Sequence, residues 1–98
     1  MSPLKVLILT TAQVGQVITT NDLTVKSIRV VGTVTTAAGH AYRIDDPSNN
    51  LRWRTVATGA YYVEESITQR QWDGGIKLAA LDSGEIHIEY ELHGSSVY

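Results

Sequence analysis

The 98-residue chain contains no cysteine, which removes two common ways of stabilising a small protein. Neither a disulfide nor a thiolate-bound metal can form. A chain of this length makes one small domain, residues 1–98, which buries only about 60–65% of its unfolded surface and has a narrow stability margin. Association with further copies is the remaining common source of stability, so we expect a homo-oligomer.

Basic clusters and long apolar runs are also missing. The net charge is −2, and only Arg52 and Arg54 form a close basic pair. Binding to nucleic acid needs a concentrated positive surface, so we expect no nucleic acid partner. No apolar run approaches the ~20 residues of a membrane span, and the apolar part of MSPLKVLILTT is too short for a signal peptide. We therefore expect a soluble protein that is made in a cytoplasm and has no membrane partner.

The motifs of common enzyme mechanisms are absent from the sequence as well. There is no GxSxG, no glycine-rich phosphate loop, and no suggestive set of Ser, His and acid. Glu64 and Glu65 are adjacent carboxylates, but neighbours on a strand point to opposite faces and cannot act as a pair. We therefore expect no enzymatic activity, no catalytic residues and no cofactor.

Strand-forming residues dominate what the sequence does contain. Thr and Val are abundant, Phe is absent, and no segment shows sustained helical periodicity. Strand-like runs recur at residues 4–10, 13–19, 24–34, 40–45, 51–58, 61–67, 70–72, 76–81 and 85–92, separated by turns such as NDL, DGG and DSG. We predict an all-β fold, a single antiparallel β-sandwich that is jelly-roll-like and has about eight short strands. A short flexible C-terminal tail is expected at about 94–98.

The first strand-like run, KVLILT, is apolar at four successive positions, so both of its faces favour burial. Val6 and Ile8 share one face, and Leu7 and Leu9 share the other. Either a loop of the same domain or another subunit covers the outer face. Leu7 and Leu9 are our candidates for a subunit interface.

The last strand-like run, residues 85–92, carries a polar row opposite its apolar residues. The row consists of Glu85, His87, Glu89 and Glu91. A metal would need further ligands from other strands, and neither His40 nor His93 has a ligand spacing, so we expect no metal. The row is then the wet face of a terminal strand that discourages edge pairing, or an acidic contact surface for a basic partner.

The segment IDDPSNN gathers oxygen ligands that could hold calcium. These residues are Asp45, Asp46, Asn49 and Asn50. They do not match the EF-hand pattern, and a β-turn with side-chain-to-backbone hydrogen bonds explains the same composition. We therefore predict a turn.

The segment LRWRT offers further contact residues. We expect Trp53 to face the core, which leaves Arg52 and Arg54 outside, where they could bind a sugar, a phosphate or an acidic surface.

Aromatic residues near turns are a second source of contact residues. Tyr61 and Tyr62 cannot both face inward, and Trp72 precedes the DGG turn. Exposed aromatics at loop ends suit sugar stacking or a protein interface, whereas the alternative for each is packing under a loop. Tyr61 and Trp72 are therefore candidate contact residues.

Three segments together resemble small all-β virion proteins of tailed bacteriophages, which are encoded near the major capsid protein. They are LTVKSIRVVGTVTTAAGHAYRIDD, LRWRTVATGAYYVEES and GGIKLAALDSGEIHIEYEL. The resemblance covers most of the chain and lies in the order of strands, glycine turns and the DP turn, and in the final LDSG strand. No catalytic or ligand motif carries it, so no family binding residue is transferred.

The resemblance implies a capsid decoration or cement protein that binds the major capsid protein and stabilises the shell. Such proteins often assemble as homotrimers on the capsid surface of the virion. Two other classes stay open: a carbohydrate-binding module of a tail fibre or tailspike, and a head–tail connector or tail component.

Overall fold

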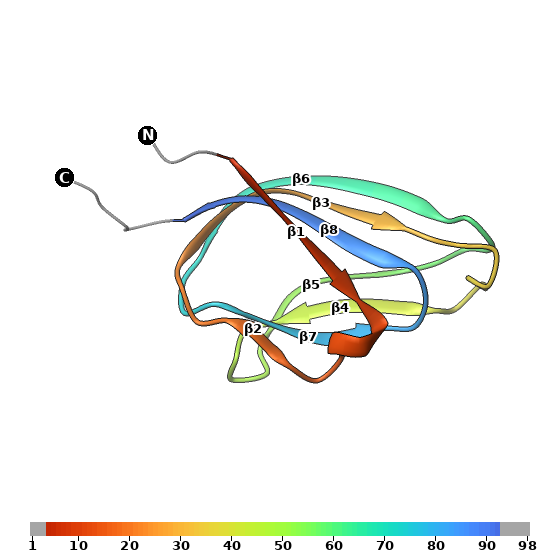
Figure 1. Cartoon of the computed structure of the whole chain (residues 1–98), viewed down its shortest axis with the longest axis horizontal. Coiled ribbons are helices and arrows are strands. Elements are labelled where there is room, and N and C mark those ends of the chain that lie inside the picture. The colour runs from red at the N-terminus through yellow and green to blue at the C-terminus, as the bar shows by residue number, and fades with distance from the viewer. Residues whose placement is uncertain (1–3, 93–98) are drawn as a thin grey trace.

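The computed structural model describes residues 4–92, which form eight β-strands in two packed four-stranded antiparallel sheets (Figure 1). Sheet A contains, in order, β1 (Lys5–Thr10), β8 (Glu85–Leu92), β3 (Leu23–Val31) and β6 (Val63–Trp72). Sheet B contains β2 (Val17–Thr19), β7 (Ile76–Leu81), β4 (Ala41–Asp45) and β5 (Leu51–Val56). One 3-10 turn, η1 (Thr11–Gln13), follows β1. The predicted all-β sandwich is confirmed, and the tail expected at 94–98 lies outside the described residues.

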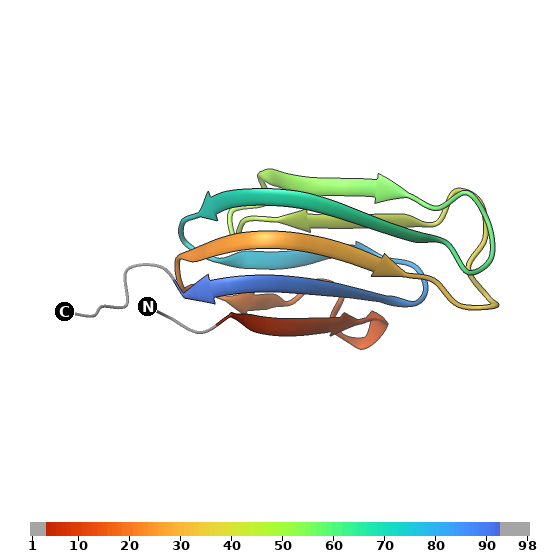
Figure 2. The ribbon, with the colours of Figure 1, turned by 90° about the horizontal axis from the view of Figure 1, so that it is seen from above.

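The strands pair like one long hairpin folded over on itself. β1 pairs with β8, β2 with β7, β3 with β6, and β4 with β5. Wrapping this nested hairpin into two layers adds the pairs β3–β8 and β4–β7. The resulting strand orders are those of an eight-stranded jelly roll, and Figure 2 shows sheet A in front with its strands in this order.

The core lies between the two sheets and is filled by alternate residues of the strands. Its largest fully buried side chains include Leu9, Leu23, Ile28, Tyr42, Ile44, Ile76, Leu78, Ile86 and Ile88. Burying one such side chain stabilises the fold by about 1.5–3 kcal/mol. On β8 the buried residues alternate with the polar row, which therefore points away from the core.

The face of β1 that was expected to form a subunit interface points into the core instead. Leu9 is fully buried and Leu7 packs against the core, so both belong to the domain's own interior. The pairing register explains this, because Leu9 lies opposite the inward-facing Ile86. The apolar side chains that β1 leaves outside are Val6 and Ile8, which are 56% and 49% exposed.

Several strands differ in extent from the sequence prediction. Those predicted over 24–34 and 51–58 end earlier, at Val31 and Val56. The predicted strand over 13–19 is shortened to β2, because η1 occupies residues 11–13 and Gly15 turns the chain with a φ of +87°. The two runs at 61–67 and 70–72 instead merge into β6. Its residue Gln69 has a φ of +45°, and the register between β6 and β3 shifts in this region. Such bulges bend a strand without ending it.

Loops 32–40 and 57–62 lie together at one end of the sandwich, away from residues 4 and 92 (Figure 1). Gly32 N–H donates to the carbonyl of Tyr62 at 2.6 Å, and Tyr61 N–H donates to the carbonyl of Thr33 at 2.9 Å. A Cβ on Gly32 would lie 2.7 Å from both the nitrogen and the oxygen of Tyr62, so only glycine allows this approach.

A small polar cluster ties turn 82–84 to loop 32–40. The buried Ser83 hydroxyl donates to Thr36 Oγ1 at 2.8 Å and lies 2.9 Å from Nδ1 of His40. These bonds satisfy polar groups that would be costly to bury alone. The loops at this end are therefore held in place by the sheets beneath them.

Candidate functional site

The polar row of β8 lies on the outer face of sheet A, which we call the acidic face. Glu85, His87, Glu89 and Glu91 alternate with residues that point inward, as the sequence predicts. However, β8 is not an edge strand, because it pairs with β1 on one side and β3 on the other. The expectation that the row protects an edge from pairing is therefore wrong, and an interior strand offers the row as the middle of a broad surface.

Apolar side chains flank the charged middle of the acidic face. Across the sheet one row of neighbours is Ile8, His87, Arg29 and Glu65, and the next is Val6, Glu89, Ser27 and Ile67. Ile67 on β6 is 68% exposed, and the nearby Val63 is also exposed. These exposed apolar side chains give the charged face apolar contact area that a purely polar sheet face lacks.

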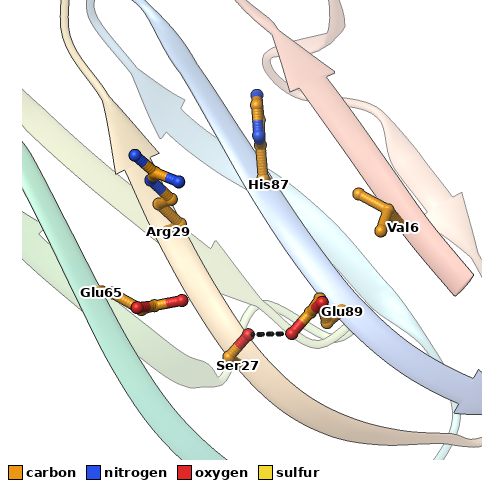
Figure 3. Close-up of a pocket in the computed structure, with 6 residues that line it drawn as sticks. All are labelled: Val6, Ser27, Arg29, Glu65, His87 and Glu89. Carbon is orange, nitrogen blue, oxygen red and sulfur yellow. Dashed lines mark hydrogen bonds between the residues drawn. The ribbon is translucent and has the colours of Figure 1, made fainter. Parts of the chain in front are cut away.

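A shallow pocket of about 180 Å³ lies in the middle of this face (Figure 3). Its lining consists of Val6, Ser27, Arg29, Glu65, His87 and Glu89. The Ser27 hydroxyl donates to Glu89 Oε1 at 2.9 Å, whereas a 2.9 Å hydrogen bond joins His87 Nε2 to Glu85 outside the lining. The Arg29 and Glu65 side chains make no hydrogen bond or ion pair within residues 4–92. Figure 3 shows the Arg29 guanidinium turned away from Glu65.

The outer face of sheet B carries the opposite charge, and we call it the basic face. Arg43 Nε contacts Asp45 Oδ1 at 2.7 Å, and Lys77 Nζ donates to Asn49 Oδ1 at 2.7 Å. Arg54 lies directly opposite Arg43 in the pairing of β4 with β5. Two like charges opposite each other are unfavourable, because each raises the energy of the other.

Arg54 is the exposed member of that arginine pair. Its guanidinium makes no hydrogen bond or ion pair within the part of the chain that the structure describes. Its neighbour Trp53 packs against the core, as the sequence predicts, so the Arg54 side chain points outward. A lone exposed guanidinium suits contact with a carboxylate of another molecule.

Arg52 and Trp72 make contacts that stabilise the domain itself. Trp72 is only 4% exposed at the end of β6, so its proposed place as a surface contact residue is corrected by its burial. The Arg52 guanidinium lies 5.7 Å from the centroid of the Trp72 ring. Arg52 Nε donates to the Gly75 carbonyl at 3.1 Å, and its Nη2 donates to the Asp73 carbonyl. Arg52 therefore fastens β5 to the turn between β6 and β7.

Tyr61 is a surface residue, and loop 32–40 gives it an apolar neighbour. Tyr61 is 66% exposed and Val34 is 67% exposed. The bond from Tyr61 to Thr33 sets the two loops side by side, and we call Val34 and Tyr61 the loop-end patch. Tyr61 has a φ of +56°, which is rare for a bulky residue and is found at binding sites. Tyr62 stacks on Tyr42 at a centroid distance of 6.4 Å, so only one of the adjacent tyrosines faces outward, as predicted.

Glu64 points between the sheets, opposite in direction to Glu65, as the alternation of a strand predicts. The hydroxyls of Thr55 (2.6 Å) and Tyr62 donate to its Oε1, and the hydroxyl of Ser66 donates to Oε2 at 3.3 Å. These donors, Thr55 foremost, lower the pKa of Glu64, and the bond to Glu64 raises the pKa of Tyr62. The carboxylate is satisfied within the domain and bridges β5 and β6, which are edge strands of different sheets.

The predicted DPSNN turn forms around the Asp46 carboxylate. Its Oδ1 accepts the N–H groups of Ser48 (2.8 Å) and Asn50 (2.9 Å), and its Oδ2 accepts the Asn50 side-chain amide at 3.0 Å. These bonds, first the backbone N–H of Asn50, lower the pKa of Asp46. In residues 4–92, no three His, Asp or Glu side chains lie close enough together to hold a metal ion.

Sequence reasoning missed two elements of these surfaces. Val34 falls at the end of the strand predicted over 24–34, whereas β3 ends at Val31, and the glycine at position 32 is the signal that could have placed Val34 in the loop. Glu65 carries no such local signal. Its position beside the polar row of β8 depends on β3 pairing with both β6 and β8.

Comparisons with protein-family models, with curated proteins and with solved structures gave no match. Among residues 4–92, no helix is long and apolar enough to cross a bilayer.

Proposed function

We propose that the chain is a non-enzymatic structural protein of a tailed-bacteriophage virion, a decoration protein that binds the assembled capsid and stabilises it as a homo-oligomer. The observation that carries this proposal is the loop-end patch. Val34 and Tyr61 expose about two thirds of their surface each, on loops that hydrogen bonds hold together. A preorganised apolar patch loses little conformational freedom on binding, which favours attachment to a rigid partner such as a protein shell.

The fold is compatible with this role, and the proposal of a viral origin rests on a resemblance in the sequence. Jelly rolls occur in viral capsid proteins and in lectins, so the fold supports the proposal only as an analogy. The assignment to a phage virion rests on the three sequence segments that resemble small virion proteins. The major capsid protein is therefore the partner that we propose for the loop-end patch.

The carbohydrate-binding alternative has less support in the arrangement of aromatic residues. Stacking on a sugar ring needs exposed aromatic faces. Trp72 is buried and Trp53 packs against the core, which leaves Tyr61 as the exposed aromatic side chain of the predicted candidates. A single exposed tyrosine beside a valine fits a protein contact better than a sugar platform.

Binding to assembled heads tests the proposal. The chain is mixed with heads of the major capsid protein encoded in the same phage genome, and bound protein is measured by co-sedimentation. We expect Val34→Asp and Tyr61→Asp to weaken binding at least about tenfold, because each places a charge in a buried contact. Asp tolerates the left-handed backbone at position 61 better than Tyr does, so folding is preserved.

Val14→Asp is the matched control. Val14 is also exposed, but it lies in the connection between η1 and β2, next to β7. Its substitution is expected to leave binding to heads unchanged. The proposal fails if the unmodified chain does not bind heads at about 50 µM, or if the two patch variants bind as tightly as Val14→Asp. Binding to isolated necks or tails instead of heads would favour the connector alternative.

A further inference from the structure

The two outer faces of the sandwich have opposite charge and the same layout. The acidic face carries four carboxylates, on Glu65, Glu85, Glu89 and Glu91, against the cations of Lys26 and Arg29. With His87 counted as neutral, its net charge is −2. The basic face carries three cations, on Arg43, Arg54 and Lys77, against Asp45, for a net charge of +2. The charges of the two faces therefore cancel when the faces meet.

Apolar side chains form the margins of both faces. On the acidic face they are Val6 and Ile8 of β1 and Val63 and Ile67 of β6. On the basic face they are Val17 of β2 and Leu51 and Val56 of β5. When two sheets pack face to face with their strands nearly aligned, edge strands lie over edge strands, which can set Arg54 of β5 in one copy over Glu65 of β6 in the other.

We propose that the acidic face of one copy packs against the basic face of a second copy, with Arg54 of that second copy seated beside Glu65 and Glu89 in the pocket. This inference deepens the proposed function and rests on it for the homo-oligomer. The Glu65 and Arg54 side chains both face outward and make no hydrogen bond or ion pair within residues 4–92, so each gains a partner on association. Arg29 lies in the same pocket but points away from Glu65, which leaves the acidic side of the pocket accessible (Figure 3).

This arrangement also explains why Arg43 and Arg54 can lie opposite each other on the basic face: Arg54 finds its opposite charge on the second copy. Arg43 is compensated by Asp45, whereas its cross-strand neighbour Arg54 is uncompensated within the described residues. The alternative packing of two acidic faces would set four carboxylates against four and is electrostatically unfavourable. A contact between two different faces is heterologous, so copies add in one direction and form a closed ring or an open row.

The size of the faces predicts a weak contact. Sheet B limits the contact, because its four strands average five residues, or about 17 Å. At a spacing of about 4.8 Å they present roughly 330 Å² per copy, or about 650 Å² in total, which is below the usual size of a specific interface. Self-association is therefore expected to depend on concentration and on salt in solution, and to strengthen where many copies are held on one surface.

Sedimentation velocity from about 10 µM to about 1 mM protein, at about 50 mM and about 500 mM NaCl, tests the contact. The mean mass of the unmodified chain is expected to rise with concentration in low salt and to rise less in high salt. Arg54→Glu and Glu65→Arg should each weaken self-association at least about tenfold. An equimolar mixture of these two variants should regain association, because every face then finds a complementary one.

Arg70→Glu is the control for net charge. Arg70 is exposed on β6 and lies opposite the inward-facing Val25, so it belongs to neither outer face. It makes the same change in charge as Arg54→Glu and should change self-association less than about twofold. Circular dichroism melting of each variant confirms that loss of association is not loss of folding.

Three outcomes would overturn the proposed contact. The first is a monomer at every concentration in low salt. The second is an equal effect of Arg54→Glu and Arg70→Glu, and the third is a mixture of the two face variants that stays monomeric. Weakening by Glu65→Arg but not by Arg54→Glu is a case of the second outcome, and would show that Glu65 meets a group other than Arg54. A chain that stays monomeric yet binds heads disproves only this contact, and one that stacks but does not bind heads disproves only the proposed function.

Discussion

Replacing Leu9 or Ile8 by alanine tests which face of β1 belongs to the core. The two residues are adjacent and of equal size, but Leu9 is fully buried and Ile8 is 49% exposed. Truncating a buried leucine costs about 2–5 kcal/mol, because its transfer energy is lost and a cavity remains. β1 is an edge strand and can move inward slightly, so we expect Leu9→Ala to cost about 2–3 kcal/mol. Ile8→Ala should cost about 1 kcal/mol or less, since half of its side chain already contacts water.

These free energies translate into a clear difference in melting temperature. For a domain of this size, 1 kcal/mol corresponds to about 4–8 °C. Leu9→Ala should therefore melt about 8–24 °C lower than the unmodified chain, and Ile8→Ala no more than about 8 °C lower. Urea unfolding followed by tryptophan fluorescence at about 5 µM protein gives the same comparison as a free energy, at a concentration where a weak self-contact is unoccupied.

A larger loss for Ile8→Ala than for Leu9→Ala would refute the register of β1 against β8, and equal losses would refute the contrast between its two faces. A shift of one residue exchanges the two faces of a strand, so the exposed and buried side chains would then trade places. A cost of Ile8→Ala that grows with protein concentration would have a different meaning. It would show that the margin of the acidic face becomes buried when copies associate.

Three further substitutions test the interior contacts. Folding lowers the pKa of Glu64, so this carboxylate stabilises the fold fully above its unfolded pKa of about 4.3, and the stabilisation is lost as pH falls through the folded pKa. Glu64→Gln should therefore flatten the acid decline of the urea midpoint below about pH 4.3, and an unchanged decline would contradict this role. Gly84→Ala should lower the free energy of unfolding by at least about 2 kcal/mol, because φ is +75° and the added Cβ would lie 2.2 Å from a carbonyl oxygen of β3. Gly59→Ala is the control: its added Cβ would meet open space, so the free energy of unfolding should hardly change. Arg52→Lys should lower the stability measured by thermal melting by about 1–2 kcal/mol, because a lysine cannot keep both carbonyl hydrogen bonds and the contact with the Trp72 ring. Arg54→Lys loses no such bonds and should cost almost nothing. Equal costs would contradict the role of Arg52 in joining β5 to the turn between β6 and β7.

Local alternation predicts the faces of β8 correctly and fails for β1, for a physical reason. On β8, polar and apolar residues alternate strictly, so the sequence shows which residues face the core and which face outward. On β1, four consecutive apolar residues give no such contrast, and the partner strand decides which pair is buried. Trp72 was misplaced because its burial depends on Arg52, a residue from another sheet that covers its ring.

The loop-end patch and the pocket of the acidic face bring together residues that are far apart in the sequence. Val34 and Tyr61 come together because β3 and β5 both end at the same end of the sandwich. Glu65 and Glu89 line one pocket because β3 lies between their strands. Strand number, turn positions and the polar row follow from local pattern, whereas such neighbours follow from the nested pairing of the strands.

The nested pairing also sets the order in which the molecule can be made. β4–β5 is a local hairpin, but β8 pairs with strands that are synthesised at the beginning and in the first third of the chain. During synthesis β1 and β3 therefore wait with open edges until residues 85–92 emerge, and pairing across such separations is slow. The middle of the acidic face forms only when β8 pairs between β1 and β3. A chain that is still being synthesised therefore cannot associate with finished copies through that surface.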